Sequence, residues 1–150
     1  MEKLNFPNCD VLIKNKENKS FIFDRVRKKW LICTKEEWVR VHCVNFLIET
    51  KGYPASWILI EKEIKVYETK KRFDIVVSSL RGENHILIEC KAPSISITQE
   101  TFDQIARYNL SLKSRFLMVT NGFDHYFCQM DYKNKRYSFL KDLPNHISIS

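Results

Sequence analysis

Three charged residues at the ends of two apolar runs are of a type and spacing that could carry out hydrolytic chemistry. Asp74 lies within FDIVV (73–77), and Glu89 and Lys91 close the run HILIECK (85–91). Residues two apart in a strand point to the same face, so Glu89 and Lys91 are presented side by side. Charges are rarely placed in apolar elements unless they are paired, bind a metal or do chemistry. The spacing therefore predicts a polar site at the end of a buried strand.

A predicted hairpin between the two runs brings Asp74 to the other two charged residues. With a loop at residues 81–84, Asp74 falls opposite Lys91 and Val76 falls opposite Glu89, so the three polar groups share one face. A slip of one residue in this register would scatter them. The residues expected to pack on the opposite face are Ile75, Val77, Ile86, Ile88 and Cys90.

This set suits a hard divalent cation. Two carboxylates, those of Asp74 and Glu89, with the backbone carbonyl of Cys90 could hold Mg²⁺ or Mn²⁺, which prefer oxygen ligands. Such an ion can polarise a phosphodiester and activate water. Lys91 could orient that water or stabilise the developing negative charge. A lone E-x-K is also common on solvated strands, so the argument depends on the convergence of all three residues.

A helix is predicted over residues 35–51, before the strands that carry these charges. Thr34 is a suitable N-cap, and Glu37 stands at the capping-box position three residues later. Gly52 marks the end of the helix. Glu37 serves as a cap in the simpler interpretation; in the other it faces inward over the sheet.

A second helix is predicted over residues 99–114, with Thr98 as its N-cap. Gln104 and Tyr108 are four residues apart and share one face. Alone, they indicate an amphipathic helix with a satisfied amide and phenol; beside the charged site, they could belong to it.

The remaining apolar runs complete an α/β fold, with a mixed sheet flanked by helices. Residues 27–31 are expected to be a connector. Strands are expected at 57–67, 116–120, 126–130 and 137–140, with a turn at 131–136 and an N-terminal hairpin at 9–25 whose turn is KNKENK. The whole is predicted to be a single domain, 1–150, divided into an N-terminal hairpin extension (1–29), a core (30–120) and C-terminal strands (121–150).

The composition indicates a cytoplasmic protein with a polyanionic partner. The net charge is +7, and the five cysteines show no zinc-ligand spacing. No apolar leader or membrane-length segment is present, so no membrane association is expected. Each basic residue near the site is either a phosphate contact or a solvated surface charge; these are Lys70, Lys71, Arg72, Arg107, Lys113 and Arg115. The lysines of KNKENK favour a solvated loop over a DNA contact, and Trp30, Trp38 and Trp57 favour core packing over base stacking.

The segments EEWVR, KRFDIVV, ILIECKAP, FDQIARYN and VTNG resemble the N-terminal nuclease domain of type I restriction enzyme R subunits, within the PD-(D/E)XK nuclease superfamily. The resemblance runs from about Trp30 to the end. It implies a restriction-endonuclease-like αβββαβ core that cuts DNA with Mg²⁺. By this resemblance the metal ligands are Asp74 and Glu89, Lys91 is catalytic, Gln104 and Tyr108 form the Q-x-x-x-Y motif, and Glu37 is the first-helix glutamate, with Glu36 and Glu61 as other candidates.

The chain departs from the family pattern in two ways, and two other functions stay open. Phe73 stands where the superfamily name has Pro, and no G-x-x-x-x-G-K-[ST] phosphate loop for a motor is present. The alternatives are a non-catalytic DNA-binding or assembly module with the nuclease fold, and a purely structural partner protein. A homodimer or other restriction-system subunits are possible partners, and cutting both strands with one site per chain would favour a dimer.

Overall fold

The structure is a computed structural model that describes residues 1–66 and 68–146. Within these residues, six strands form a mixed sheet, three form a separate antiparallel sheet, and two α-helices are present. No helix in the described ranges is both long enough and apolar enough to cross a membrane. The elements are β1 (Ile13–Lys16), β2 (Lys19–Asp24), β3 (Lys29–Ile32), α1 (Lys35–Asn45), a π-helical turn η1 (Phe46–Thr50), a 3₁₀ turn η2 (Ala55–Trp57), β4 (Ile58–Val66), β5 (Thr69–Ser78), β6 (Asn84–Cys90), α2 (Gln99–Leu112), β7 (Phe116–Thr120), β8 (His125–Asp131) and β9 (Arg136–Leu140).

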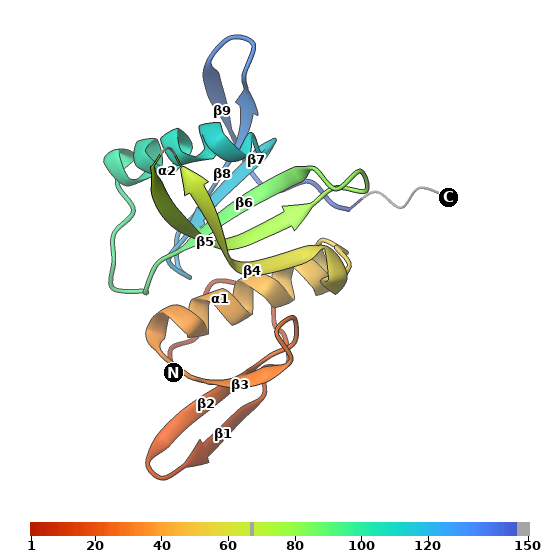
Figure 1. Ribbon diagram of the computed structural model, residues 1–150. Helices are drawn as coiled ribbons and strands as arrows, with labels where there is room; N and C mark the ends of the chain where they lie inside the picture. The colour runs from red at the N-terminus through yellow and green to blue at the C-terminus, as the bar shows by residue number, and fades with distance from the viewer. Residues whose placement is uncertain (67, 147–150) are drawn as a thin grey trace.

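The large sheet lies between the two α-helices, with α1 below it and α2 above it in Figure 1. Its strand order is β4-β5-β6-β7-β8-β9. β6 and β7 are parallel and are joined through α2, as a parallel pair requires a crossover, and the other neighbours are antiparallel. The predicted α/β class and the αβββαβ order, here α1-β4-β5-β6-α2-β7, are confirmed.

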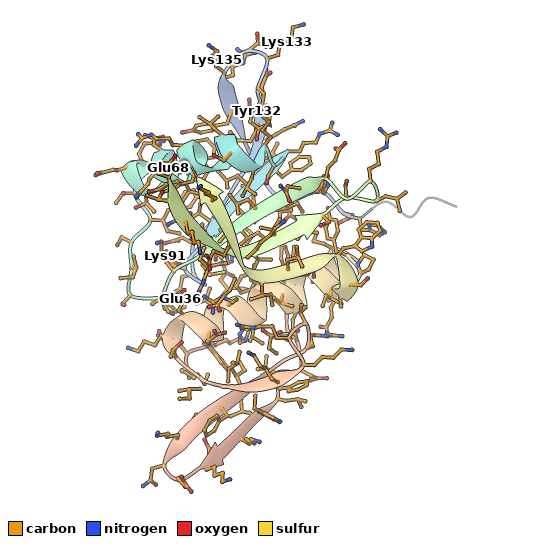
Figure 2. All side chains as sticks on the ribbon, in the orientation of Figure 1. Glu36, Glu68, Lys91, Tyr132, Lys133 and Lys135 are labelled. Atoms are coloured by element: carbon orange, nitrogen blue, oxygen red, sulfur yellow. The ribbon has the colours of Figure 1, made fainter. Side chains whose placement is uncertain are left out.

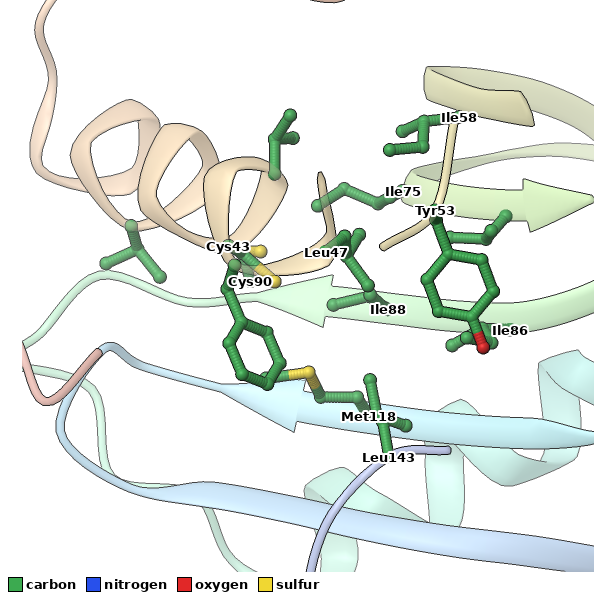
Figure 3. Packing of buried hydrophobic residues seen from close by; sticks show 14 of the residues in the cluster. Cys43, Leu47, Tyr53, Ile58, Ile75, Ile86, Ile88, Cys90, Met118 and Leu143 are labelled. Atoms are coloured by element: carbon green, nitrogen blue, oxygen red, sulfur yellow. The ribbon is translucent and has the colours of Figure 1, made fainter. Parts of the chain in front are cut away.

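The two faces of the sheet bury separate apolar clusters. The predicted inward set of β5 and β6 packs against Cys43 of α1 and Leu47 of η1 (Figure 3), which confirms that set. Cys43 and Cys90 lie close together in this layer, and their sulfurs are drawn side by side in Figure 3. The opposite face packs against Phe102 and Ile105 of α2. Buried side chains on both faces explain why the central strands read as nearly continuous apolar runs.

The predicted register of the β5–β6 hairpin is wrong by two residues. Ile75 pairs with Ile88, and a β-bulge at Val77 and Ser78 lets Ser78 pair with Asn84. The loop thus begins earlier than the predicted 81–84. Because the shift is even, every side chain keeps its predicted face. Continuing the register places Asp74 level with Glu89 instead of Lys91.

The N-terminal hairpin was predicted correctly as antiparallel, but its extent was wrong. The turn shrinks to Glu17 and Asn18, both with positive φ (52° and 62°), as a tight two-residue hairpin requires. The predicted connector at 27–31 is largely strand β3, which pairs with the open edge of β2. The run Trp30–Ile32 is too short to show a period, so the pattern alone did not reveal a strand.

Trp30 lies on the surface of this small sheet, with 37% of its area exposed, so the expectation of core packing is wrong for this residue. Its ring packs on Phe23 of the neighbouring strand, with 5.3 Å between centroids. Cross-strand contact of this kind occupies an aromatic ring without burying it.

Both α-helices begin where the sequence predicts. Thr34 accepts the N–H of Glu37 and Thr98 accepts the N–H of Thr101. The first helix passes into the π-helical turn, which ends just before Gly52. The second ends at Leu112, two residues earlier than expected. Tyr67, the last residue of the strand predicted at 57–67, lies outside the described residues. So do residues 147–150, at the end of the predicted domain.

Candidate active site

The site forms where β5 and β6 separate. The ladder between them ends at the pair Ile75–Ile88, and beyond it Asp74 faces the open backbone of β6. The Cys90 N–H donates to Asp74 Oδ2 at 2.8 Å. A side-chain carboxylate thus replaces a carbonyl as the partner of this amide, so the Asp74 side chain lies between the two strands.

Arg40 of α1 binds Asp74 from the other side. Its guanidinium donates to Asp74 Oδ1 at 2.7 Å and to Glu36 Oε1 at 2.8 Å, and it makes a further ion pair with Glu37. Only 4% of Arg40 is exposed. Burial alone would lower the pKa of Arg40, but the hydrogen bond and charge of Asp74, followed by the charge of Glu37, raise it. Arg40 is therefore a permanent positive charge that balances the carboxylate of Asp74.

The ion pairs continue from Arg40 to the N-terminal sheet. Arg27, after β2, donates to Glu37 Oε2 at 2.9 Å and to the buried Asp24 at 2.6 Å. Asp24, Arg27, Glu37, Arg40 and Asp74 thus form one chain of alternating charges. Buried charges are tolerated when each has an opposite partner, as here.

Glu89 is the least satisfied group in the cluster. It is 8% exposed, and its buried Oε1 meets no hydrogen-bond donor among the described residues. Burial, followed by the charge of the neighbouring Asp74 and a hydrogen bond with it, raises the pKa of Glu89 to about 8, against the opposing charges of Lys71 and Lys91. An orphaned buried oxygen beside a second carboxylate fits a cation, whose charge would replace the missing donor.

Lys91 completes the predicted set. Its backbone N–H donates to Thr120 O at 2.8 Å, which extends the pairing of β6 with β7 by one residue. The ammonium lies close enough to Glu89 and Glu36 to act on both electrostatically, and Figure 2 shows Lys91 and Glu36 at the same edge of the molecule. The structure therefore brings Asp74, Glu89 and Lys91 together, although through a different register from the one predicted.

The two α2 residues differ in their relation to this cluster. The Lys71 ammonium lies 4.7 Å from the centroid of the Tyr108 ring, and the same ammonium acts on Glu89. Tyr108 therefore reaches the carboxylates through Lys71. Gln104 is exposed and has no hydrogen-bond partner in the described part of the chain.

All three candidate glutamates lie around Arg40. The Thr34 half of the predicted capping box forms, because the Thr34 hydroxyl accepts the Glu37 N–H. The Glu37 carboxylate instead binds Arg27 and Arg40, and the Thr34 N–H donates to Ile32 O, so the interpretation of Glu37 as a cap is wrong. Glu61 lies 3.7 Å from Arg40 and has a left-handed backbone (φ 55°), which interrupts the β4–β5 ladder level with Asp74. Burial raises the pKa of Glu36, and the charge of Asp74 raises it further.

Four of the predicted phosphate contacts lie on β5 and α2; they are Lys70, Lys71, Arg72 and Arg107. Lys70 is exposed and forms a surface ion pair with Glu63 at 3.4 Å. Arg72 and Arg107 are also exposed. The Lys71 ammonium, in contrast, packs on the Tyr108 ring and acts electrostatically on Glu89. This set thus provides three solvent-facing cations and one at the site.

Sequence reasoning missed Arg40 and Arg27. For Arg40 a signal existed, because Glu36 and Glu37 stand four and three residues before it, the spacing of helical ion pairs. No local pattern marks Arg27, whose partners come from three different elements. Within residues 1–66 and 68–146, no three His, Cys, Asp or Glu side chains are placed to hold one metal ion. A cation at Asp74 and Glu89 would therefore take further ligands from the backbone and water.

Residues 35–144, from the start of α1 to just beyond β9, match the family described as Type I restriction enzyme R protein N terminus. The chain belongs to this family. None of the curated proteins compared matches it. Its fold is similar to that of a fragment described as an HsdR subunit of a type I restriction enzyme from Vibrio vulnificus YJ016, with a TM-score of 0.53 and 19% identity. The similarity covers 75% of this chain and 24% of that one, so the chain spans about a quarter of its relative.

Proposed function

We propose that this chain is a metal-dependent nuclease domain of the PD-(D/E)XK type that hydrolyses phosphodiester bonds of DNA. The observation that carries the proposal is the pair of adjacent carboxyl groups of Asp74 and Glu89, with an orphaned buried oxygen on Glu89 and the Lys91 ammonium beside them. Membership of a restriction-enzyme subunit family supports the same chemistry.

Each residue of the cluster has a role in this proposal. Asp74, Glu89 and the Cys90 carbonyl would hold Mg²⁺ or Mn²⁺. The ion would supply charge to polarise the scissile phosphate and to acidify a bound water. Lys91 orients the attacking water and stabilises negative charge on the phosphate. Tyr108 positions Lys71 against the carboxylates.

Arg40 maintains the site when no metal is bound. Its guanidinium balances Asp74, while Glu89 carries a proton below a pH of about 8. Two negative charges at this spacing would otherwise repel each other in a buried setting. Metal binding would therefore release a proton from Glu89 and weaken the hold of Arg40 on Asp74.

The substrate and partners follow from the surrounding charge. Lys70, Arg72 and Arg107 would contact DNA phosphates, which makes binding salt-dependent. The family relation favours assembly with other restriction-system subunits.

Calorimetric titration with Mg²⁺ and Mn²⁺ and plasmid nicking test the proposal on the same samples. We expect wild type to bind metal and to nick DNA, Asp74→Asn to do neither, and Lys91→Ala to bind metal but lose nicking. Lys135→Ala, on the exposed β8–β9 turn, is the control and should behave as wild type. Nicking that persists in Lys91→Ala would contradict the role of that residue. DNA binding without nicking in wild type, with either metal, would refute the nuclease function and favour a binding module.

A further inference from the structure

The outward face of the N-terminal sheet is the feature outside the candidate site that most resembles a binding surface. β1–β3 lie on the far side of α1 from the large sheet (Figure 1). Ile22 of β2 is fully buried against Val41 of α1, so this face of the small sheet points inward. The register places the alternate residues of all three strands on the other face, which points away from the rest of the molecule.

Aromatic rings occupy the centre of this outward face. Phe23 and Trp30 are directly opposite each other on β2 and β3, and Phe21 is next to them on β2. Trp30 is exposed and Phe21 and Phe23 are half-buried, so the rings present surface to solvent without any core role. Beside them Ile32 is 54% exposed.

Lysines surround these rings. The Lys14 ammonium lies over the Trp30 ring at 4.4 Å, and Lys16 and Lys19 face each other at the end of the β1–β2 hairpin. Alternation places all three lysines on the same side as the rings, and no acidic residue of β1–β3 shares that side. Residues 12–32 contain seven of the 25 lysines and arginines but only two of the 18 acidic residues. The acidic residue of β2, Asp24, points inward to Arg27.

We propose that this face binds single-stranded DNA, with bases stacked on Trp30, Phe23 and Phe21 and phosphates on Lys14, Lys16 and Lys19. Stacking on exposed rings flanked by cations is how proteins hold unpaired strands without reading their sequence. Duplex DNA does not fit this face, because its bases already stack on each other. An apolar protein partner fits less well, because it would strip water from three lysines without offering them a counter-charge.

This surface is separate from the carboxylate cluster and lies outside the residues that match the restriction-enzyme family, 35–144. The inference concerns the same class of substrate as the proposed nuclease but does not depend on cleavage. It assigns to β1–β3 the role of holding an unpaired strand.

Fluorescence anisotropy with a labelled 20-nucleotide oligo(dT), in EDTA, tests the inference on the full chain. We expect Trp30→Ala to bind about tenfold more weakly, since one lost stacked base typically costs about 5- to 150-fold. Trp30→Phe should recover most of the affinity because it restores a ring. The pair Lys14→Gln/Lys16→Gln should reduce the slope of log K against log salt by about 1.4, since each phosphate contact on a single strand contributes about 0.7.

The matched control is Lys133→Gln/Lys135→Gln, which removes the same charge from the opposite end of the molecule (Figure 2). It should bind as wild type does. Equal loss in both double variants, unchanged binding by Trp30→Ala, or a preference for a duplex of the same length would each overturn the inference. EDTA prevents cleavage during this binding measurement. If the protein binds oligo(dT) in this pattern but never nicks DNA with Mg²⁺ or Mn²⁺, the nuclease proposal is refuted and the inference about β1–β3 stands.

Discussion

Removing the guanidinium of Arg40 tests how the carboxylate cluster is held together. In Arg40→Met the side chain keeps its length and apolar stem but loses its charge. Glu36 is about half exposed and loses little, and Glu37 keeps Arg27. Asp74 loses its ion-pair partner and keeps the Cys90 N–H and the hydrogen bond with Glu89, neither of which supplies a positive charge. Breaking a buried ion pair by removing one partner costs about 3–5 kcal/mol, and we expect a loss of unfolding free energy in this range.

Urea denaturation at pH 7 in EDTA measures this loss, and a double-mutant cycle assigns it. Asp74→Asn removes the stranded charge, so Arg40→Met should cost about 2 kcal/mol less in that background than in wild type. The control is Arg25→Met, because Arg25 forms an ion pair with Glu49 at a distance of 2.9 Å in which both side chains are 43% exposed. Exposed pairs contribute about 0–1 kcal/mol, so the control should be nearly neutral. Equal losses for Arg40→Met and Arg25→Met, or no coupling to Asp74, would refute the reasoning.

Two further predictions concern Glu89 and Asn109. Because the pKa of Glu89 is about 8 in the folded protein against 4.5 for the free group, the folded state holds the proton more tightly. The stabilisation is therefore complete below about pH 4.5 and is lost as pH rises to about 8, at up to about 1.4 kcal/mol per pH unit. Urea denaturation between pH 5.5 and 7.5 should show this fall in wild type and a shallower one in Glu89→Gln; parallel slopes would contradict it. Asn109 is fully buried, and its side chain accepts the Ser114 N–H and donates to the Ser114 carbonyl. Asn109→Ala should lower the unfolding free energy by about 1–3 kcal/mol, because it leaves a buried N–H unpaired; a thermal midpoint equal to that of wild type would contradict this.

Local patterns in the sequence determined the two α-helices, the strands of the large sheet and the inward faces of its central strands, but not β3. The helix starts at Thr34 and Thr98 depend on hydrogen bonds within one turn, and those bonds form as predicted. The two sides of β5 and β6 follow from the period of two, which survives any even shift of register. The spacing of Glu89 and Lys91 placed both charges at one end of a central strand for the same reason.

The tertiary structure alone decided the exact register and the partners of the charges. The bulge at Ser78 depends on how two whole strands fit together, and it set Asp74 level with Glu89. Arg40 reaches Asp74 only because α1 packs against the point where β5 and β6 separate, although the two residues are 34 positions apart. Trp30 is exposed because the small sheet has a single partner, α1, and so buries one face only. Periodicity predicts that a side chain shares a face with others, whereas the packing of elements far apart in the chain determines what that face meets.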